Sequence, residues 1–226
     1  MLSTKLKNAR ASRGNVLFMI LIAIALIAGL TYAITRTENG GDAMSRERAD
    51  LAADQLAGFA LNLKRAAENI TRAGYSETQI SFASDQLTGY GTPDSNPRAE
   101  VFNIAGGGVS YMPPPANVSD GSQWEFTGST AAPGVGDDAT PDLMVVFPHI
   151  SEAVCRAYNK KAGYDPAGSI PTDSGECVYN TAKRFDGTFP SSGANTMDAN
   201  TFRVPAPFAC VQCGNDYNAY YVLLER

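Results

Sequence analysis

The strongest hydrophobic pattern of the chain is an unbroken apolar run close to its start. Every residue from 16 to 30 except Gly29 is strongly apolar or alanine, and residues 14–35 carry no charge. A helix over residues 15–34 would be about 30 Å long, which matches the hydrocarbon core of a bilayer. Because lipid offers the backbone no hydrogen bonds, this pattern predicts a single transmembrane helix.

The charge ahead of the apolar run predicts its orientation. Lys5, Lys7, Arg10 and Arg13 precede the run, and no acidic residue accompanies them. Basic residues favour the cytoplasmic side, so we expect the N-terminus inside and the rest of the chain exported. Two alternatives stay open at this point: a secretory signal peptide cleaved after residues 31–33 (Thr-Tyr-Ala), and an uncleaved signal anchor.

A second helical pattern follows the apolar run. Its apolar positions recur every three or four residues and most charged residues fall opposite them, which is typical of an amphipathic helix. We expect this helix to follow a flexible joint at residues 39–41 (Asn-Gly-Gly), to be capped by Asp42 and to end near Gly74. The stripe consists of Ala52, Leu56, Phe59, Leu63, Ala66 and Ile70.

After residue 74, short strand patterns alternate with loops rich in glycine and proline. The expected strands cover residues 99–104, 109–112, 123–127, 143–147, 177–179 and 217–225. The first two would form a hairpin around Gly106, Gly107 and Gly108, and a helix is expected at residues 151–161. Strands without long helices between them predict an α+β head, in which a mainly antiparallel sheet has helices on one face.

Net charge limits the class of partner. The whole chain carries −5, and the four cations of the leader lie before residue 14, so the exported part carries −9. A surface this acidic argues against binding to a phosphate backbone, and we expect no nucleic-acid partner.

Four cysteines, Cys155, Cys177, Cys210 and Cys213, lie in the part that is expected to be exported. Disulfides persist outside the cytoplasm, so we expect two bridges. Three pairings are possible. We favour Cys155–Cys177 with Cys210–Cys213, whereas the crossed pairings would tie the last strand to the helix at residues 151–161. A four-thiolate zinc site and a redox-active Cys-x-x-Cys are the alternatives, but only one cysteine pair is close and no βαβ pattern flanks it.

The start of the chain resembles a known class of signal sequence. A short basic leader ends at Gly14 and the apolar helix begins at once, which is similar to the class III signal of type IV pilins and type II secretion pseudopilins. The resemblance covers residues 1–73. It implies that a prepilin peptidase cuts between Gly14 and Asn15, and that the apolar helix stays on the subunit.

The resemblance also implies how the chain is organised. A cytoplasmic basic leader (1–14) would precede one long N-terminal helix (15–73) with an apolar membrane or filament-core half and an amphipathic half, which packs on the sheet of an exported head (74–226). The subunit would wait in the lipid of the inner membrane and then join other pilin-like subunits in a periplasmic or extracellular filament.

Assembly would run through the start of the apolar helix. The resemblance places Val16, Leu17, Phe18, Met19, Ile20, Leu21 and Ile22 in the helical core of the filament. The family usually has a glutamate at the fifth position after the cut, where it pairs with a neighbour's N-terminal amine. This chain has Met19 there, which cannot form such a pair.

Signals of catalysis are weak. The one histidine, His149, lies in a loop without a Gly-x-Ser-x-Gly turn, and no zinc-protease, phosphate-loop or dinucleotide motif occurs. Asp137, Asp138 and Asp142 are expected to form a solvated loop rather than a calcium site. We therefore expect no enzyme, no cofactor and no metal. The alternative to a filament subunit is a single-pass inner-membrane-anchored periplasmic protein that binds a partner through its head.

Overall fold

A computed structural model describes residues 14–36, 38–137, 140–191 and 195–226, with the backbone alone for residues 14–17, 30–36 and 38–44. The chain forms two compact units, Met1–Ser45 and Arg46–Arg226. The first contains helix α1 (Gly14–Arg36), which covers the predicted apolar helix. Over the residues with described side chains, no helix is both long and apolar enough to cross a membrane. Residues 1–13 of the predicted leader lie outside the described residues.

Helix α2 (Glu38–Arg72) contains the predicted amphipathic helix but begins earlier. The predicted joint at residues 39–41 lies inside α2, so Asp42 is not its N-cap, and both expectations were wrong. Each glycine costs a helix only about 1 kcal/mol relative to alanine, which is too little to stop a helix once it propagates. The predicted end is confirmed, because Gly74 follows Arg72 with a φ of +97°, the left-handed conformation that glycine favours after a helix.

The second unit is built around a mixed sheet. Its strands are β1 (Glu125–Ala131), β2 (Asp142–Phe147), β3 (Asn195–Thr196), β4 (Phe208–Cys213) and β5 (Asp216–Leu224), in the order β3-β1-β2-β5-β4. The pairs β1–β2, β2–β5 and β4–β5 are antiparallel, whereas the short edge strand β3 runs parallel to β1. The α+β class is confirmed, and the parallel edge strand makes the sheet mixed.

Strand β2 lies at the centre of the sheet, as its continuous apolar sequence predicts. All six of its residues are buried. Successive side chains of a strand point to opposite faces, and Leu143 and Val145 accordingly join one hydrophobic cluster while Met144 and Val146 join another. The sheet therefore has two buried faces, and each needs a cover.

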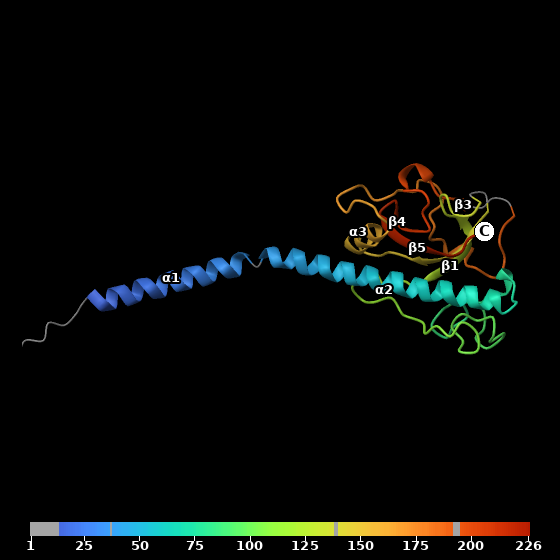
Figure 1. Ribbon diagram of the computed structural model, residues 1–226, viewed down its shortest axis with the longest axis horizontal. Coiled ribbons are helices and arrows are strands. Elements are labelled where there is room, and N and C mark those ends of the chain that lie inside the picture. Colours follow the sequence, from blue (N-terminus) through green and yellow to red (C-terminus); the bar gives the residue numbers. More distant parts are fainter. Residues whose placement is uncertain (1–13, 37, 138–139, 192–194) are drawn as a thin grey trace, which may run out of the picture. The chain divides into compact units, whose positions relative to one another are not determined.

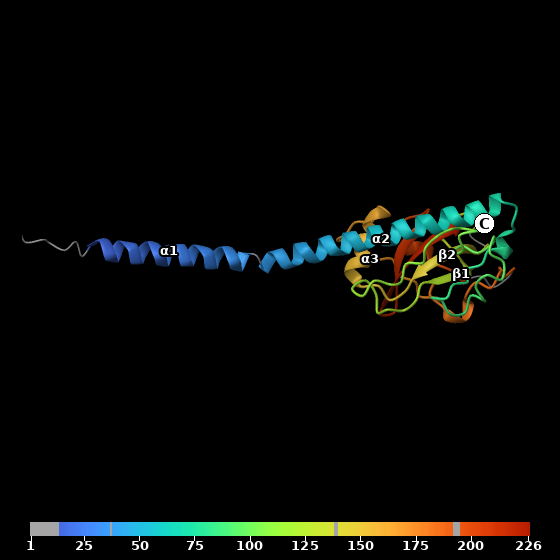
Figure 2. The same cartoon turned by 90° about the horizontal axis from the view of Figure 1, so that it is seen from below.

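Two helices, together with irregular chain at residues 80–118, cover the first face, which we call the helix-covered face. The predicted stripe of α2 packs there, with Leu56 and Leu63 fully buried, and both views show α2 lying along the sheet (Figures 1 and 2). The rings of Phe59 and Phe147 lie 6.4 Å apart across this contact. Helix α3 (Glu152–Lys161) also packs there, and Ser151 caps it by accepting a hydrogen bond from the Val154 N–H.

Mostly irregular chain covers the second face, which we call the loop-covered face. Its cover includes Val178, Met197, Phe202 and Ala206, which pack on Met144 and other inward residues of the strands. In the described residues of 164–206 the regular elements are β3 and two short 3₁₀-helices, η2 (Thr181–Lys183) and η3 (Ala199–Thr201). A third, η1 (Glu77–Gln79), follows α2.

Two predicted strand regions are wrong. Residues 99–107 form mostly turns and residues 109–112 are irregular, so no hairpin forms. The buried carboxylate of Glu100 holds the turns by accepting hydrogen bonds from the backbone N–H groups of Asp94 and Asn96. Residues 177–179 are loop and are held by a disulfide rather than by strand pairing. The predicted strand at 123–127 is displaced to β1, and the predicted last strand is confirmed as β5.

Candidate functional site

Helix α1 presents an apolar surface to its surroundings. Its large side chains are between 41% exposed, for Ile22, and 68% exposed, for Leu26. Residues 18–22 are consecutive, so at 100° per residue their side chains surround the helix rather than forming one stripe. The exposed set is Phe18, Met19, Ile20, Leu21, Ile22, Ile24, Leu26 and Ile27.

The structure describes the side chains of only some of the predicted assembly and processing residues. The assembly residues from Phe18 to Ile22 belong to this exposed surface, Met19 among them at 64%. Gly14, Asn15, Val16 and Leu17 belong to the backbone of α1, and their side chains lie outside the described part of the molecule.

The prediction of two disulfides is confirmed, but the favoured pairing is wrong. The bonds join Cys155 to Cys210 and Cys177 to Cys213. Cys210 and Cys213 both lie on β4, and residues three apart on a strand point to opposite faces, so these two sulfurs cannot meet. The turn that follows β4 begins only at Gly214, beyond both cysteines.

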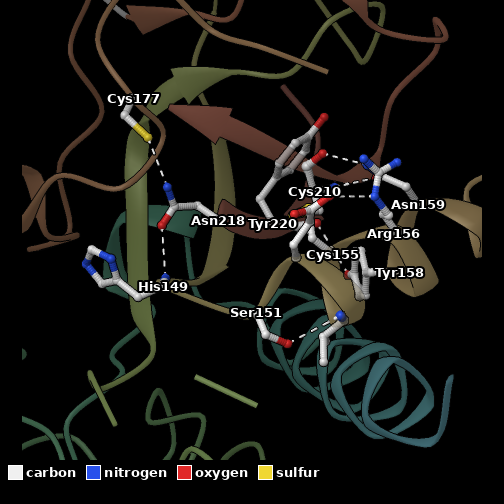
Figure 3. Close-up of a disulfide and its surroundings, with 12 residues drawn as sticks. His149, Ser151, Cys155, Arg156, Tyr158, Asn159, Cys177, Cys210, Asn218 and Tyr220 are labelled. Atoms are coloured by element: carbon white, nitrogen blue, oxygen red, sulfur yellow. Dashed lines mark hydrogen bonds and ion pairs between the residues drawn. A yellow bond between two sulfur atoms is a disulfide. The ribbon is translucent and has the colours of Figure 1, made fainter. Parts of the chain in front are cut away.

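The Cys155–Cys210 bond, which we call the core disulfide, ties α3 to β4 on the helix-covered face. Its Cα atoms lie 5.3 Å apart and both cysteines are fully buried. Asn159 of α3 brackets the backbone of Cys210: its Nδ2 donates to the Cys210 carbonyl at 2.8 Å, and its Oδ1 accepts from the Cys210 N–H at 2.7 Å (Figure 3). Covalent and polar contacts thus fix the same strand position.

The Cys177–Cys213 bond, which we call the rim disulfide, ties the loop cover to the other face of β4. Its Cα atoms lie 5.8 Å apart, and both cysteines are half-buried. The Nδ2 group of Asn218 donates to the Sγ atom of Cys177 at 3.3 Å, and the Oδ1 atom of Asn218 accepts from the N–H of His149 at 3.2 Å (Figure 3).

His149 takes part in this arrangement through its backbone and its ring. Its φ of +51° is unusual for a residue with a Cβ. The ring meets that of Tyr179 edge-to-face at 4.8 Å, and its Nδ1 atom lies 3.5 Å from a carboxylate oxygen of Asp216. The hydroxyl nearest to His149 in the sequence belongs to Ser151, and it accepts a hydrogen bond as the N-cap of α3.

The described residues offer little support for a metal site, including a calcium site. They contain no group of three or more His, Cys, Asp or Glu side chains arranged to hold a metal. Asp142, predicted to lie in a solvated loop, is instead fully buried and accepts hydrogen bonds from the N–H groups of Ala132 and Arg226. Burial raises the pKa of Asp142 to about 6. This carboxyl holds the C-terminal residue in place, and Asp138 lies outside the described residues.

A second buried carboxylate, Glu125, was missed in the sequence. Arg184 binds both of its oxygens at 2.6 Å, and the hydroxyl of Tyr90 donates to one of them. Burial, followed by the nearby Glu125 charge, raises the pKa of Tyr90 well above its usual value. The signal was a single acidic residue between Trp124 and Phe126 in a strand pattern. The contacts hold two loops on β1 and are structural.

A groove of about 510 Å³ lies between α2 and α3. Its apolar walls are formed by alanines, including Ala49 and Ala157. Two cations of its rim are paired: the Nζ of Lys160 lies 3.4 Å from an Asp50 carboxylate oxygen, and the Nε of Arg156 lies 2.8 Å from Glu152. Comparisons of the chain with family models, curated proteins and solved structures found no match.

Proposed function

We propose that this chain is a structural subunit of a type IV pilus-like or pseudopilus filament, assembled through its apolar N-terminal helix. It enters the inner membrane with its N-terminus in the cytoplasm, loses the leader after Gly14, and then joins other pilin-like subunits. Its partners are a prepilin peptidase, membrane lipid before assembly, and neighbouring subunits. Its work is mechanical rather than catalytic.

The exposed apolar surface of α1 is the observation that carries this proposal. Burying one large apolar side chain is worth about 1.5–3 kcal/mol, so the eight exposed side chains represent roughly 12–24 kcal/mol. A surface of this size is expected to be covered by lipid or by other protein. Because the apolar residues surround the helix, a bundle of like helices covers them better than a single flat partner does.

The head also supports this proposal, because it has a hydrophobic core of its own. Its hydrophobic core begins at Ala49 and draws on α2, α3 and the sheet, and two disulfides fasten the two covers. The described members of that core all belong to the unit Arg46–Arg226. A head that is stable by itself leaves the apolar helix available for assembly.

Met19 sharpens the proposal. An apolar side chain here avoids burying a carboxylate, which would cost several kcal/mol if it lacked a partner. We infer that the register of this subunit is set by helix shape and head contacts, or that the subunit occupies a special position such as the tip. Met19→Glu should be tolerated only where a neighbour's free amine lies within ion-pair reach.

The mature N-terminus tests the proposal directly. Intact mass spectrometry of the membrane-extracted chain should show a species that begins at Asn15. A chain that begins at Met1 would identify a signal anchor, and one that begins at Ile34 would identify a secretory signal. Gly14→Val should block processing, whereas Gly29→Val should not, because nothing lies within 4 Å of a Cβ built at Gly29.

Filament formation is the second test. Electron microscopy of sheared material should show filaments that contain this chain, and Leu21→Lys should abolish its incorporation because a lysine in an apolar bundle is costly. The head of that variant should still form both disulfides. A processed chain that never enters a filament would favour the membrane-anchored alternative.

A further inference from the structure

The two disulfides share strand β4 but differ in access to solvent. Cys155 and Cys210 are fully buried between α3 and the sheet, whereas Cys177 and Cys213 are each half-buried at the rim. Thiol–disulfide exchange requires a thiolate to reach a disulfide sulfur, so access alone separates the two bonds.

The polar surroundings of the two bonds also differ. At the rim, Asn218 donates an N–H to the Sγ atom of Cys177, and its orientation is fixed because its oxygen accepts the His149 N–H (Figure 3). Asn218 itself is only 1% exposed, so this donor is held in place. At the core disulfide, the corresponding amide of Asn159 is engaged with the backbone of Cys210.

A hydrogen-bond donor beside a sulfur favours the thiolate over the bonded sulfur. The better leaving group in exchange is the sulfur whose thiolate is more stable. At the rim disulfide this sulfur is Cys177, so an incoming thiolate should attack Cys213.

We propose that the rim disulfide is a site of thiol–disulfide exchange with a protein dithiol, that Cys213 is the sulfur attacked and Cys177 the leaving group, and that the core disulfide stays closed. This inference does not depend on the proposed filament function.

The reaction balances in two steps. A thiolate of the dithiol forms a bond to the Sγ of Cys213, the Cys177–Cys213 bond breaks, and its electron pair stays on Cys177, which then takes a proton from water. The second thiolate of the dithiol then attacks the first sulfur of the dithiol, which is bonded to Cys213 in the mixed disulfide. The bond between the two dithiol sulfurs forms, and Cys213 leaves as a thiolate that takes a proton from water. The head gains two electrons and two protons, and the dithiol becomes a disulfide.

Exchange would release one cover of the sheet and leave the other in place. Cys177 precedes Val178, which is buried in the loop-covered cluster, and the rim disulfide is the covalent bond that holds this segment to β4. Cys155 and Cys210 would keep α3 on the helix-covered face. Reduction therefore loosens the loop cover without separating α3 from the sheet.

Selectivity is measured first, on the full chain in detergent with dithiothreitol as the dithiol. Timed alkylation followed by peptide mass spectrometry should show Cys177 and Cys213 modified at least about tenfold faster than Cys155 and Cys210. Equal rates, or faster modification of the core pair, would overturn the proposal.

The direction of attack is measured next. A thioredoxin that lacks its second active-site cysteine should be trapped as a mixed disulfide, and the peptide map should place it on Cys213. A trap located mainly on Cys177 would overturn the assignment of the leaving group, and a trap on Cys155 or Cys210 would overturn the site.

The role of Asn218 is tested with a matched pair of variants. Asn218→Asp keeps the oxygen that His149 needs and removes the donor to sulfur, so rim exchange should slow by about fivefold. Asn215→Asp adds the same charge in the exposed turn after β4 and should leave the rate within twofold of wild type. Equal rates for the two variants would show that the Asn218 donor does not affect rim exchange. The selectivity and trapping experiments test the exchange site itself and need no variant of Asn218.

Discussion

The sheet of the head is buried on both faces, yet the two covers are held by different forces. Leu143 and Met144 are neighbours on β2 and are both fully buried, but Leu143 belongs to the cluster under α2 and α3 while Met144 lies under mostly irregular chain. The helices satisfy their own backbone hydrogen bonds and add a periodic apolar stripe. The loop cover depends on individual contacts, such as the Tyr220 hydroxyl donating to the Ala206 carbonyl at 2.8 Å.

This difference shows how a head of this size orders a long irregular cover. Fixing each residue of a loop costs about 1–2 kcal/mol of backbone entropy, and a loop has no repeating hydrogen bonds to offset the cost. The rim disulfide and side-chain bridges such as Ser174 to Asp198, at 2.6 Å, supply that restraint. We expect the helix-covered face to respond to mutation as one packed core and the loop-covered face to respond locally.

Removing the disulfides should give the largest effects. The bonds span 55 and 36 residues, so each is worth about 4 kcal/mol in the chain-entropy model. Replacing Cys155 and Cys210 by alanine should cost roughly 1 kcal/mol more, because two fully buried sulfurs leave space behind. Replacing Cys177 and Cys213 should cost no more than the entropic amount. Urea unfolding followed by the fluorescence of Trp124, which is fully buried, measures both.

Hydrogen exchange on the same double variants separates local from global effects. Loss of the rim disulfide should speed exchange in the loop cover and leave α3 protected, whereas loss of the core disulfide should affect α3 and β4 together. If the rim variant proves the less stable of the two, or if its α3 exchanges faster, the two faces are not independent.

Shortening neighbouring side chains on β2 compares the two covers at one place. Leu143→Ala should cost about 4 kcal/mol, because the packed helices cannot collapse into the space, while Met144→Ala should cost about 2 kcal/mol because the loop cover can adjust. Urea midpoints at constant slope measure the difference. Equal losses would show that the loop cover is as rigid as the helical one.

The helices and the central strand of the helix-covered face are also the elements that sequence reasoning predicted well. The stripe of α2, the continuous apolar run of β2 and the cap on α3 are local patterns, and local patterns carry the periodicity of the element that they form. The predicted joint at residues 39–41 was wrong because the local glycine signal is weak. Its penalty of about 1 kcal/mol per glycine is smaller than the gain from helix propagation on both sides.

The loop-covered face and the rim site were not predictable in this way. The cysteine pairing depends on which face of β4 each cysteine occupies, and β4 was not among the strands predicted from the sequence. The contact of Asn218 with Cys177 joins residues 41 positions apart, and the contact of Glu125 with Arg184 joins residues 59 apart. No local period encodes such contacts, because tertiary packing decides them.

The buried carboxyl of Asp142 makes the stability of the head depend on pH. Burial raises its folded-state pKa from 3.8 to about 6, so the folded head binds a proton more tightly than the unfolded chain does. The contribution of this group to stability is fully present below pH 4, and it is lost as the pH rises from about 4 to about 6. Asp142→Asn should flatten that interval in urea unfolding curves, whereas Asp85→Asn, at an exposed position, should leave it unchanged. An unchanged slope in Asp142→Asn would assign the pH dependence elsewhere.

The smallest expected effects come from two surface ion pairs, one on each cover. Lys161 of α3 lies 2.5 Å from a carboxylate oxygen of Asp54 in α2, and Lys183 of η2 lies 2.5 Å from Glu176 beside the rim disulfide. Exposed pairs are worth at most about 1 kcal/mol, because water screens both partners.

The two pairs should nevertheless differ. Asp54 is 65% exposed, whereas Glu176 is 38% exposed, and the hydrogen bond from Lys183 is the main cause that lowers the pKa of Glu176. A lowered carboxyl pKa adds stability above its unfolded value, which is lost as the pH falls through the folded one. Lys183→Ala should therefore cost more than Lys161→Ala, and the contribution of the Lys183 pair should weaken as the solution is acidified below about pH 4.5. Double-mutant cycles with Glu176→Gln and Asp54→Asn measure each coupling energy. A larger coupling in the Lys161 pair would mean that ion pairs contribute more to the helical cover than to the loop cover, which is opposite to the division of forces inferred from the two faces.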